Sequence, residues 1–115
     1  MTEESMELIR KPSREELDII RYLVDKADYN NDNWQEGLMV RKLPEGMGSL
    51  KLLYPNIDEW ERQFGRQISD VCFKDVDGVD VIVSLYVDTD NRLYELDVWK
   101  TDYSDLIQIS RFEDS

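Results

Sequence analysis

The sequence predicts an α+β fold, in which an N-terminal amphipathic helix packs on one face of a twisted antiparallel sheet of about five strands. Apolar residues recur at helical spacing near the start of the chain, and apolar and polar residues alternate strictly over residues 79–88. The hairpins on either side of the alternating segment can both be aligned to give one apolar face. That face needs a cover, which the helix provides, so the local patterns agree on one fold.

The composition limits the classes of function. The chain has 115 residues, with 14 basic and 26 acidic side chains, no histidine and a formal net charge of -12. This length suits one acidic domain over residues 1–115. The acidity argues against a nucleic-acid partner, because a phosphate backbone needs a basic face. The lack of histidine removes the commonest metal ligand and the usual general base. We therefore expect a protein that is not an enzyme, with no catalytic residue, cofactor or metal site.

The expected location is the cytoplasm. The sequence has no run of about 18 apolar residues, so we expect no membrane contact. The first twelve residues carry acids and no apolar run, which does not fit a secretory signal. The single cysteine, Cys72, cannot form an intrachain disulfide and fits a reducing compartment.

The predicted helix spans residues 14–27. Ser13 and Glu16 have the spacing of a capping box, in which the serine hydroxyl accepts from the Glu16 amide and the glutamate carboxylate returns the bond. A polar stretch over residues 28–33 ends the helix. Its apolar residues follow the helical period: Leu17, Ile20, Leu23, Val24 and Ala27.

Two strands are predicted over residues 38–43 and 49–54, with a turn of one proline and two glycines between them. The segment over residues 55–65 leaves two interpretations open. A short helix would explain its helical spacing, whereas a loop would bury Trp60. The residues with helical spacing are Ile57, Trp60 and Phe64.

The strand over residues 79–88 follows a strand over residues 68–74 through a turn that ends at Gly78. A two-residue loop would place Lys74 beside Val81 on the apolar face. A three-residue loop with Gly78 in the left-handed conformation avoids this. Because a one-residue slip exchanges the two faces, burial favours the second register. That register pairs Phe73 with Val81, and Val71 with Val83.

A second hairpin joins this strand to one over residues 92–99, through a turn over residues 88–91. A loop of two or four residues gives a single register, and its apolar face agrees with that of the first hairpin. We expect the C-terminal piece to tuck against the sheet edge with three apolar residues, Leu106, Ile107 and Ile109. The predicted cross-strand pairs are Leu85 with Tyr94, Val83 with Leu96, and Val81 with Val98.

The opposite face of this hairpin mixes aromatic, apolar and acidic side chains. Aromatic anchors beside acids suit a surface that binds a basic protein. Alternatively, the C-terminal tail or the Trp60 segment covers this face, and Trp99 and Ile82 are then ordinary core residues. One strand contributes Ile82, Ser84 and Tyr86, and the next contributes Leu93, Glu95, Asp97 and Trp99. The expected neighbours are Tyr86 with Leu93, Ser84 with Glu95, and Ile82 with Asp97.

Several patterns that suggest chemistry have simpler structural explanations. Glu95 and Asp97 point the same way, as in a cation site or an acid-base pair. However, Lys100 has the wrong spacing from Asp97 for a metal-dependent nuclease, and the chain lacks the basic groove of such an enzyme. The turn over residues 88–91 lacks the glycine and the closing glutamate of a calcium loop. Cys72 has no histidine to activate it as a nucleophile.

Three strings of residues stand out along the chain: Met47-Gly48-Ser49-Leu50, Asp75-Val76-Asp77-Gly78-Val79 and Glu95-Leu96-Asp97-Val98-Trp99-Lys100-Thr101-Asp102-Tyr103. They resemble the signature of a bacterial family of small acidic proteins described only as a domain of unknown function. The resemblance covers most of the chain and implies no reaction. Small acidic proteins of this kind include immunity proteins encoded beside bacterial toxins. The last string also has a structural interpretation, in which Lys100 pairs with a neighbouring acid.

The sequence favours a non-enzymatic protein-binding domain, and specifically an immunity protein or antitoxin that neutralises a basic, nuclease-type bacterial toxin. One alternative is a structural or regulatory module that forms a homodimer through an exposed strand edge. Another is an enzyme or metal-binding domain that uses Glu95, Asp97 and Asp102. The residues expected to bind the partner are Asp80, Tyr86, Glu95, Asp97, Trp99 and Asp102.

Overall fold

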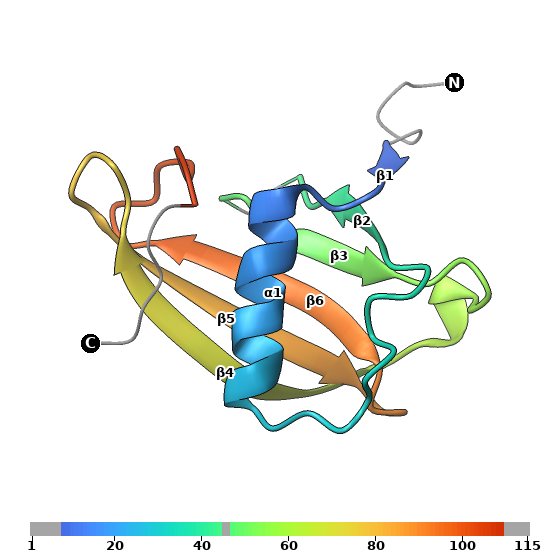
Figure 1. Cartoon of the computed structure of the whole chain (residues 1–115). Coiled ribbons are helices and arrows are strands. Elements are labelled where there is room, and N and C mark those ends of the chain that lie inside the picture. Colours follow the sequence, from blue (N-terminus) through green and yellow to red (C-terminus); the bar gives the residue numbers. More distant parts are fainter. Residues whose placement is uncertain (1–7, 45–46, 110–115) are drawn as a thin grey trace, which may run out of the picture.

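The computed structural model describes residues 8–44 and 47–109, and it confirms the α+β fold (Figure 1). The described strands form one antiparallel sheet in the order β1-β2-β3-β6-β5-β4, and α1 lies across one side of it. The sheet has six strands rather than about five, because the two-residue strand β1 is too short to show a sequence period. The elements are β1 (Ile9–Arg10), α1 (Arg14–Lys26), β2 (Met39–Lys42), β3 (Leu50–Leu53), the 3-10 turn η2 (Glu59–Glu61), β4 (Phe64–Lys74), β5 (Asp80–Asp88) and β6 (Leu93–Lys100).

Helix α1 starts with the predicted capping box. The Ser13 hydroxyl accepts from the amide of Glu16 at 3.1 Å, and the Glu16 carboxylate accepts from the amide of Ser13 at 2.8 Å. The same carboxylate receives two bonds from the guanidinium of Arg10, at 2.8 and 2.9 Å. The start of the helix is therefore fixed to β1 by one glutamate.

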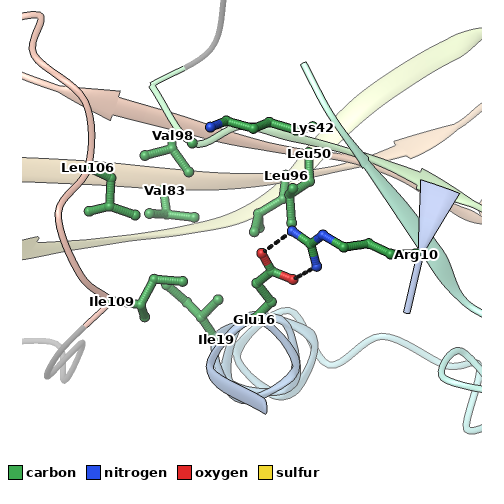
Figure 2. A pocket seen from close by; sticks show the side chains of 11 residues that line it. Arg10, Glu16, Ile19, Lys42, Leu50, Val83, Leu96, Val98, Leu106 and Ile109 are labelled. Carbon is green, nitrogen blue, oxygen red and sulfur yellow. Dashed lines mark hydrogen bonds and ion pairs between the residues drawn. The ribbon is translucent and has the colours of Figure 1, made fainter. Parts of the chain in front are cut away.

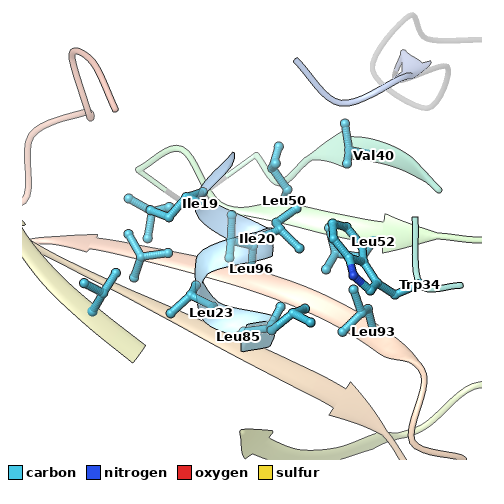
Figure 3. Close-up of a cluster of buried hydrophobic side chains, with 14 of the residues drawn as sticks. Ile19, Ile20, Leu23, Trp34, Val40, Leu50, Leu52, Leu85, Leu93 and Leu96 are labelled. Carbon is cyan, nitrogen blue, oxygen red and sulfur yellow. The ribbon is translucent and has the colours of Figure 1, made fainter. Parts of the chain in front are cut away.

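The core lies between α1 and the sheet (Figure 3). Helix residues Ile19, Ile20 and Leu23 are fully buried. They face aliphatic side chains of the central strands, and Trp34, from the segment between α1 and β2, lies at one end of this cluster. The sheet residues labelled in Figure 3 are Val40, Leu50, Leu52, Leu85, Leu93 and Leu96. In the chain as described, residues 8–44 and 47–109, no helix combines the length and apolarity needed to cross a bilayer.

The first hairpin, β4–β5, has the predicted register. Phe73 lies opposite Val81, and Val71 lies opposite Val83. The amide of Asp75 donates to the Val79 carbonyl at 2.9 Å, which closes a three-residue loop. Gly78 has φ of 84°, the left-handed conformation that this loop requires.

The second hairpin, β5–β6, differs from the predicted register by two residues. Leu85 lies opposite Leu96, Val83 opposite Val98, and Val81 opposite Lys100. The predicted pairs of Leu85 with Tyr94, Val83 with Leu96 and Val81 with Val98 are therefore wrong. On the other face, Tyr86 lies opposite Glu95, Ser84 opposite Asp97 and Ile82 opposite Trp99. The pairs expected there, Tyr86 with Leu93, Ser84 with Glu95 and Ile82 with Asp97, are wrong for the same reason.

The two-residue difference has two local causes. The loop has three residues, because the amide of Asp88 donates to the Arg92 carbonyl and Asn91 adopts φ of 65°. A β-bulge then adds one residue, Tyr94, to β6. The loop and the bulge each shift the pairing of β6 by one residue. Because two such shifts return the side chains to the same face, Asp97 stays on its predicted face. Leu93 precedes the bulge and, contrary to its predicted place on that same face, is fully buried in the core.

The segment before β4 contains a helical turn, η2, and not a loop that buries Trp60. The Trp60 side chain is 91 % exposed. Strand β4 starts at Phe64, four residues earlier than predicted, and two register shifts near its start hide the strand period. A side chain at Gly65 would place its Cβ 2.6 Å from the carbonyl oxygen of Asp88, so glycine permits the close approach of β5.

A buried lysine joins the end of β6 to the first hairpin. Lys100 Nζ donates to Asp75 Oδ2 at 2.9 Å and to Asp77 Oδ2 at 2.7 Å. The side chains of Lys100 and Asp75 are both fully buried. The Asp75 carboxylate also accepts from the amides of Ile107 and Gln108, at 2.7 and 3.1 Å. We call Lys100, Asp75, Asp77 and this part of the tail the Lys100 cluster, and it confirms the expected pairing of Lys100 with an acid.

The C-terminal piece packs on the helix side of the sheet and not against a sheet edge. Leu106 and Ile109 pack on the core, and the amide of Leu106 donates to the Met47 carbonyl at 3.1 Å. The expectation that Ile107 packs with them is wrong, since it is 60 % exposed. The reason is that its amide is held by Asp75, which turns the side chain outward.

A second buried cation lies at the opposite end of β5. The guanidinium of Arg62 donates from Nε to Asp88 Oδ2 at 2.8 Å and from one terminal nitrogen to the Leu52 carbonyl at 2.7 Å. Its other terminal nitrogen donates to the Leu93 carbonyl. Arg62 and these partners form the Arg62 cluster. It connects the end of β3, the start of β6 and the segment before β4.

The first prediction concerns the burial of Lys100. Replacing Lys100 by methionine leaves the buried Asp75 carboxylate without its ammonium partner, which is strongly unfavourable. We expect the midpoint of thermal unfolding to fall by roughly 10 °C. The matched control is Lys74→Met, because Lys74 contacts Asp80 at 2.7 Å but its side chain is 68 % exposed. Equal midpoints for the two variants would contradict a role of burial.

The second prediction concerns acid stability. Burial raises the pKa of Asp75, but the amide of Ile107 and the Lys100 ammonium lower it more, to about 2 from an ordinary 3.8. The unfolded chain therefore binds this proton more readily, so the stabilisation is complete above about pH 4 and is lost as the pH falls toward 2. Chemical denaturation at a series of pH values should show a shallower loss of stability over this window for Asp75→Asn than for the wild type. The same slope in both proteins would be inconsistent with this pKa.

Candidate functional site

A small cavity opens between α1 and the sheet (Figure 2), with a volume of about 180 Å³. Apolar side chains from α1, the sheet and the tail line most of it, and Arg10 and Glu16 lie at one side. Burial raises the pKa of Glu16, but the bonds from Arg10 and from the Ser13 amide outweigh it and lower the pKa overall. Glu16 is therefore an ionised structural partner of Arg10. The described lining also includes the amine of Lys42, and it has no other acid and no hydroxyl or thiol.

The side of the sheet away from α1 carries a different set of groups. We call it the open face. It includes outward side chains of β3, β6, β5 and β4, which lie in rows across neighbouring strands. One row is Cys72, Ile82 and Trp99, and the next is Asp70, Ser84 and Asp97. A further row is Tyr86 on β5, Glu95 on β6 and Lys51 on β3.

The register places five of the six predicted partner-binding residues on the open face, with Asp80 at one end and Tyr86, Glu95, Asp97 and Trp99 grouped together. Asp80 lies at the start of β5 and forms an exposed ion pair with Lys74 at 2.7 Å. Asp102 lies in the turn after β6, where its carboxylate accepts from the amide and the hydroxyl of Ser104, at 3.0 and 2.6 Å. Asp80 and Asp102 therefore lie at one end of the face.

The described tail does not cover the open face, because Leu106 and Ile109 pack on the helix side. Trp99 keeps 40 % of its surface exposed, and its ring lies 6.3 Å from that of Tyr103. Trp60 is exposed and does not cover the face, although Phe64 of the same segment packs its ring against Tyr86. Among the described residues, this leaves a partly open aromatic and acidic surface on β5 and β6, in which Tyr86, Glu95 and Asp97 are half-buried.

Electrostatic repulsion is built into this face. Burial raises the pKa of Glu95, Lys51 lowers it, and the neighbouring Asp97 raises it again, with a net increase. The pKa of Tyr86 is raised by burial and by the carboxylates of Asp97 and Glu95. The negative charge of Asp97 thus opposes that of Glu95, and a positive charge brought to this face from outside would relieve the repulsion.

The described part of the chain contains no cluster of three acids or cysteines that could hold a metal ion. What the open face offers is hydrogen-bond acceptors and aromatic surface. Lys51 Nζ lies 3.4 Å from the centre of the Tyr94 ring, which shows that one aromatic group of this region already binds a cation. The chemistry that suits the face is recognition of cationic side chains.

Two exposed aromatic residues next to the open face are absent from the partner-binding set that the sequence predicts. Phe64 is 56 % exposed, and its ring lies 5.3 Å from that of Tyr86. Trp60 lies four residues earlier and is the more exposed of the two. The available signal was the composition of residues 58–61, in which three acids surround a tryptophan.

The three strings of residues that stand out in the sequence meet in space around the Lys100 cluster. The amide of Lys100 donates to the sulfur of Met47 at 3.2 Å, and the amide of Val98 donates to the hydroxyl of Ser49 at 2.7 Å. Lys100 then reaches the turn at Asp75, as described above. The three strings therefore supply contacts that fasten the sheet and the tail, while Asp97 and Trp99 of the third string point to the open face.

The comparisons with known proteins give one family. Its profile, described as "Domain of unknown function (DUF6984)", matches residues 9–110. Neither a curated protein nor a solved structure matches this chain.

The third prediction concerns the charges of the open face. We expect Asp97→Asn to lower the pKa of Glu95, because a neighbouring negative charge is removed, and Lys51→Met to raise it, because a positive charge is removed. Titration of the side-chain carboxyl signals by carbon-13 NMR measures both effects. A Glu95 pKa that is unchanged in both variants would show that these groups do not interact.

Proposed function

The chain belongs to the DUF6984 family, whose description assigns no activity, and on the geometry of its open face we propose that it is a non-enzymatic protein-binding domain. We further propose that it acts in the cytoplasm as an immunity protein or antitoxin for a basic, nuclease-type bacterial toxin. The observation that carries this proposal is the grouping of Tyr86, Glu95, Asp97 and Trp99 on one sheet surface, where Trp99 is exposed and the other three are half-buried.

The raised pKa of Glu95 supports a binding role. A carboxyl with a folded-state pKa above its unfolded value destabilises the fold wherever it is ionised, and this penalty disappears as the pH falls through that pKa. At neutral pH, Glu95 thus weakens the fold that carries it. Groups kept at the expense of stability are typical of functional surfaces.

The proposed action is steric and electrostatic. The carboxylates would occupy the sites at which a basic groove holds phosphate groups, and the aromatic rings would supply the apolar contacts that an interface needs at its centre. The net charge of -12 accelerates association with a cationic partner. Rigid strands hold these side chains, so little order has to be gained on binding.

The alternative of a homodimer through a sheet edge receives less support. Strand β4 lies at one edge and spans eleven residues, but its two register shifts disrupt a regular edge. In addition, Lys26 Nζ donates to the backbone carbonyl of Asp70 at 2.6 Å, which occupies one acceptor on β4.

The test of the proposed function uses the protein encoded by the adjacent gene as the candidate toxin. We expect a stable complex and loss of the toxin's nuclease activity on mixing. The double variant Glu95→Gln with Asp97→Asn should weaken binding roughly tenfold, because charged interfacial pairs are lost. The matched control is Asp18→Asn with Asp25→Asn, which removes the same charge from the exposed side of α1.

Isothermal titration calorimetry measures each affinity, and sedimentation of the free chain measures its oligomeric state. Absence of a complex would contradict the proposal. Equal weakening by both double variants would assign the effect to net charge and not to the open face. A free chain that sediments as a stable dimer would favour the homodimer alternative.

A further inference from the structure

Trp60 is an exposed residue on a fixed backbone. Its side chain is 91 % exposed, the highest value among the large apolar side chains that the structure describes. It occupies the middle residue of η2, between Glu59 and Glu61. Leaving an indole in water forgoes the stabilisation that its burial in the core would provide.

The backbone before Trp60 is held by two side chains. The Glu59 carboxylate accepts two bonds from the guanidinium of Arg41 on β2, at 2.9 and 2.8 Å. Asp58 Oδ1 accepts from the amide of Trp60 itself at 3.0 Å, which caps the turn. The Arg41 bonds lower the pKa of Glu59, so this contact is an ion pair at neutral pH.

The backbone after Trp60 is held by the Arg62 cluster. Arg62 is buried and donates to Asp88 and to the carbonyls of Leu52 and Leu93. Trp60 is therefore flanked within two residues by a bidentate surface ion pair and by a buried arginine. A side chain that is exposed while its backbone is fastened on both sides is preorganised for insertion into another surface.

We propose that Trp60 is the anchor of the partner interface, and that the partner receives its indole in an apolar pocket rimmed by lysine or arginine. The rim follows from charge complementarity, because Asp58 and Glu61 lie within two residues of Trp60 in the sequence and are exposed. This inference rests on the proposed function, since it assigns a contact to the same basic protein partner. Exposed tryptophans that fill a partner's pocket dominate the binding energy of many interfaces.

The anchor is continuous with the open face. Arg41, which holds Glu59, lies opposite Lys51 on β3, and Lys51 lies opposite Glu95 on β6. Phe64, four residues after Trp60, contacts the ring of Tyr86. One partner surface can therefore touch the Trp60 turn and the carboxylates of β6 together.

The experiment compares Trp60→Ala, Trp60→Phe and the wild type for binding to the product of the adjacent gene. We expect Trp60→Ala to weaken binding about 30-fold or more, with Trp60→Phe between it and the wild type. The control is Ile107→Ala, which removes an exposed apolar side chain at the opposite end of β5. Because Trp60 is almost fully exposed, its variants should keep the wild-type midpoint of thermal unfolding.

Fluorine-19 NMR of the chain labelled with fluorotryptophan gives a second readout, in which the Trp60 signal is assigned by its loss in Trp60→Phe. We expect this signal to shift on addition of the partner. If the partner binds the wild type and Trp60→Ala with equal affinity and the Trp60 signal does not shift, Trp60 is not the anchor of the interface. The proposed function would still stand. A partner that does not bind the wild type overturns both.

Discussion

The buried contact between Lys100 and Asp75 holds together the last strand, the turn of the first hairpin and the tail. The carboxylate of Asp75 organises its own turn, accepting from the amide of Val76, and also holds the tail and the last strand. Asp88 occupies the same position in the second hairpin, accepts from the amide of Asp90 and pairs with Arg62. The loops of these two hairpins thus each start with an aspartate that closes the loop, and a buried carboxylate of this kind needs a cation. Lys100 supplies this cation beside the start of β5, and Arg62 supplies it at the end, so both ends of the strand are held in place.

The local features of the fold could be predicted from the sequence, and the features that depend on distant partners could not. The capping box and the first hairpin follow from neighbouring residues and from a glycine in the loop. The second register failed because Asn91 takes the left-handed conformation without being glycine, and because nothing around Tyr94 marks a bulge. Arg62 and Lys100 resemble surface cations in sequence, since the carboxylates that allow their burial lie 26 and 25 residues away.

The same division applies to the candidate site. The alternation of β5 and β6 was enough to place Glu95 and Trp99 on one face. A register error of two residues changes the cross-strand partners but leaves each of these side chains on the same face. Whether that face was covered depended on the tail, whose path is set by Asp75. The Trp60 turn depended on Arg41 and Arg62, from two other parts of the chain. The two buried clusters fasten β5 at both ends. A fold held in this way can carry repelling carboxylates between the two clusters and an exposed indole beside one of them.

The bulge at Tyr94 also constrains how this chain can change in length. Compared with a two-residue loop, the three-residue loop shifts the pairing of β6 by one residue, and the bulge shifts it by one more. A shift of one residue exchanges the two faces of a strand, so two such shifts return each side chain to its original face. Loss of one residue from either the loop or the bulge would turn Leu96 and Val98 toward solvent and Asp97 into the core. Among relatives, insertions or deletions in the loop over residues 89–91 should therefore occur together with a compensating change at the bulge. Two sites that are separate in the sequence would then vary as one evolutionary unit.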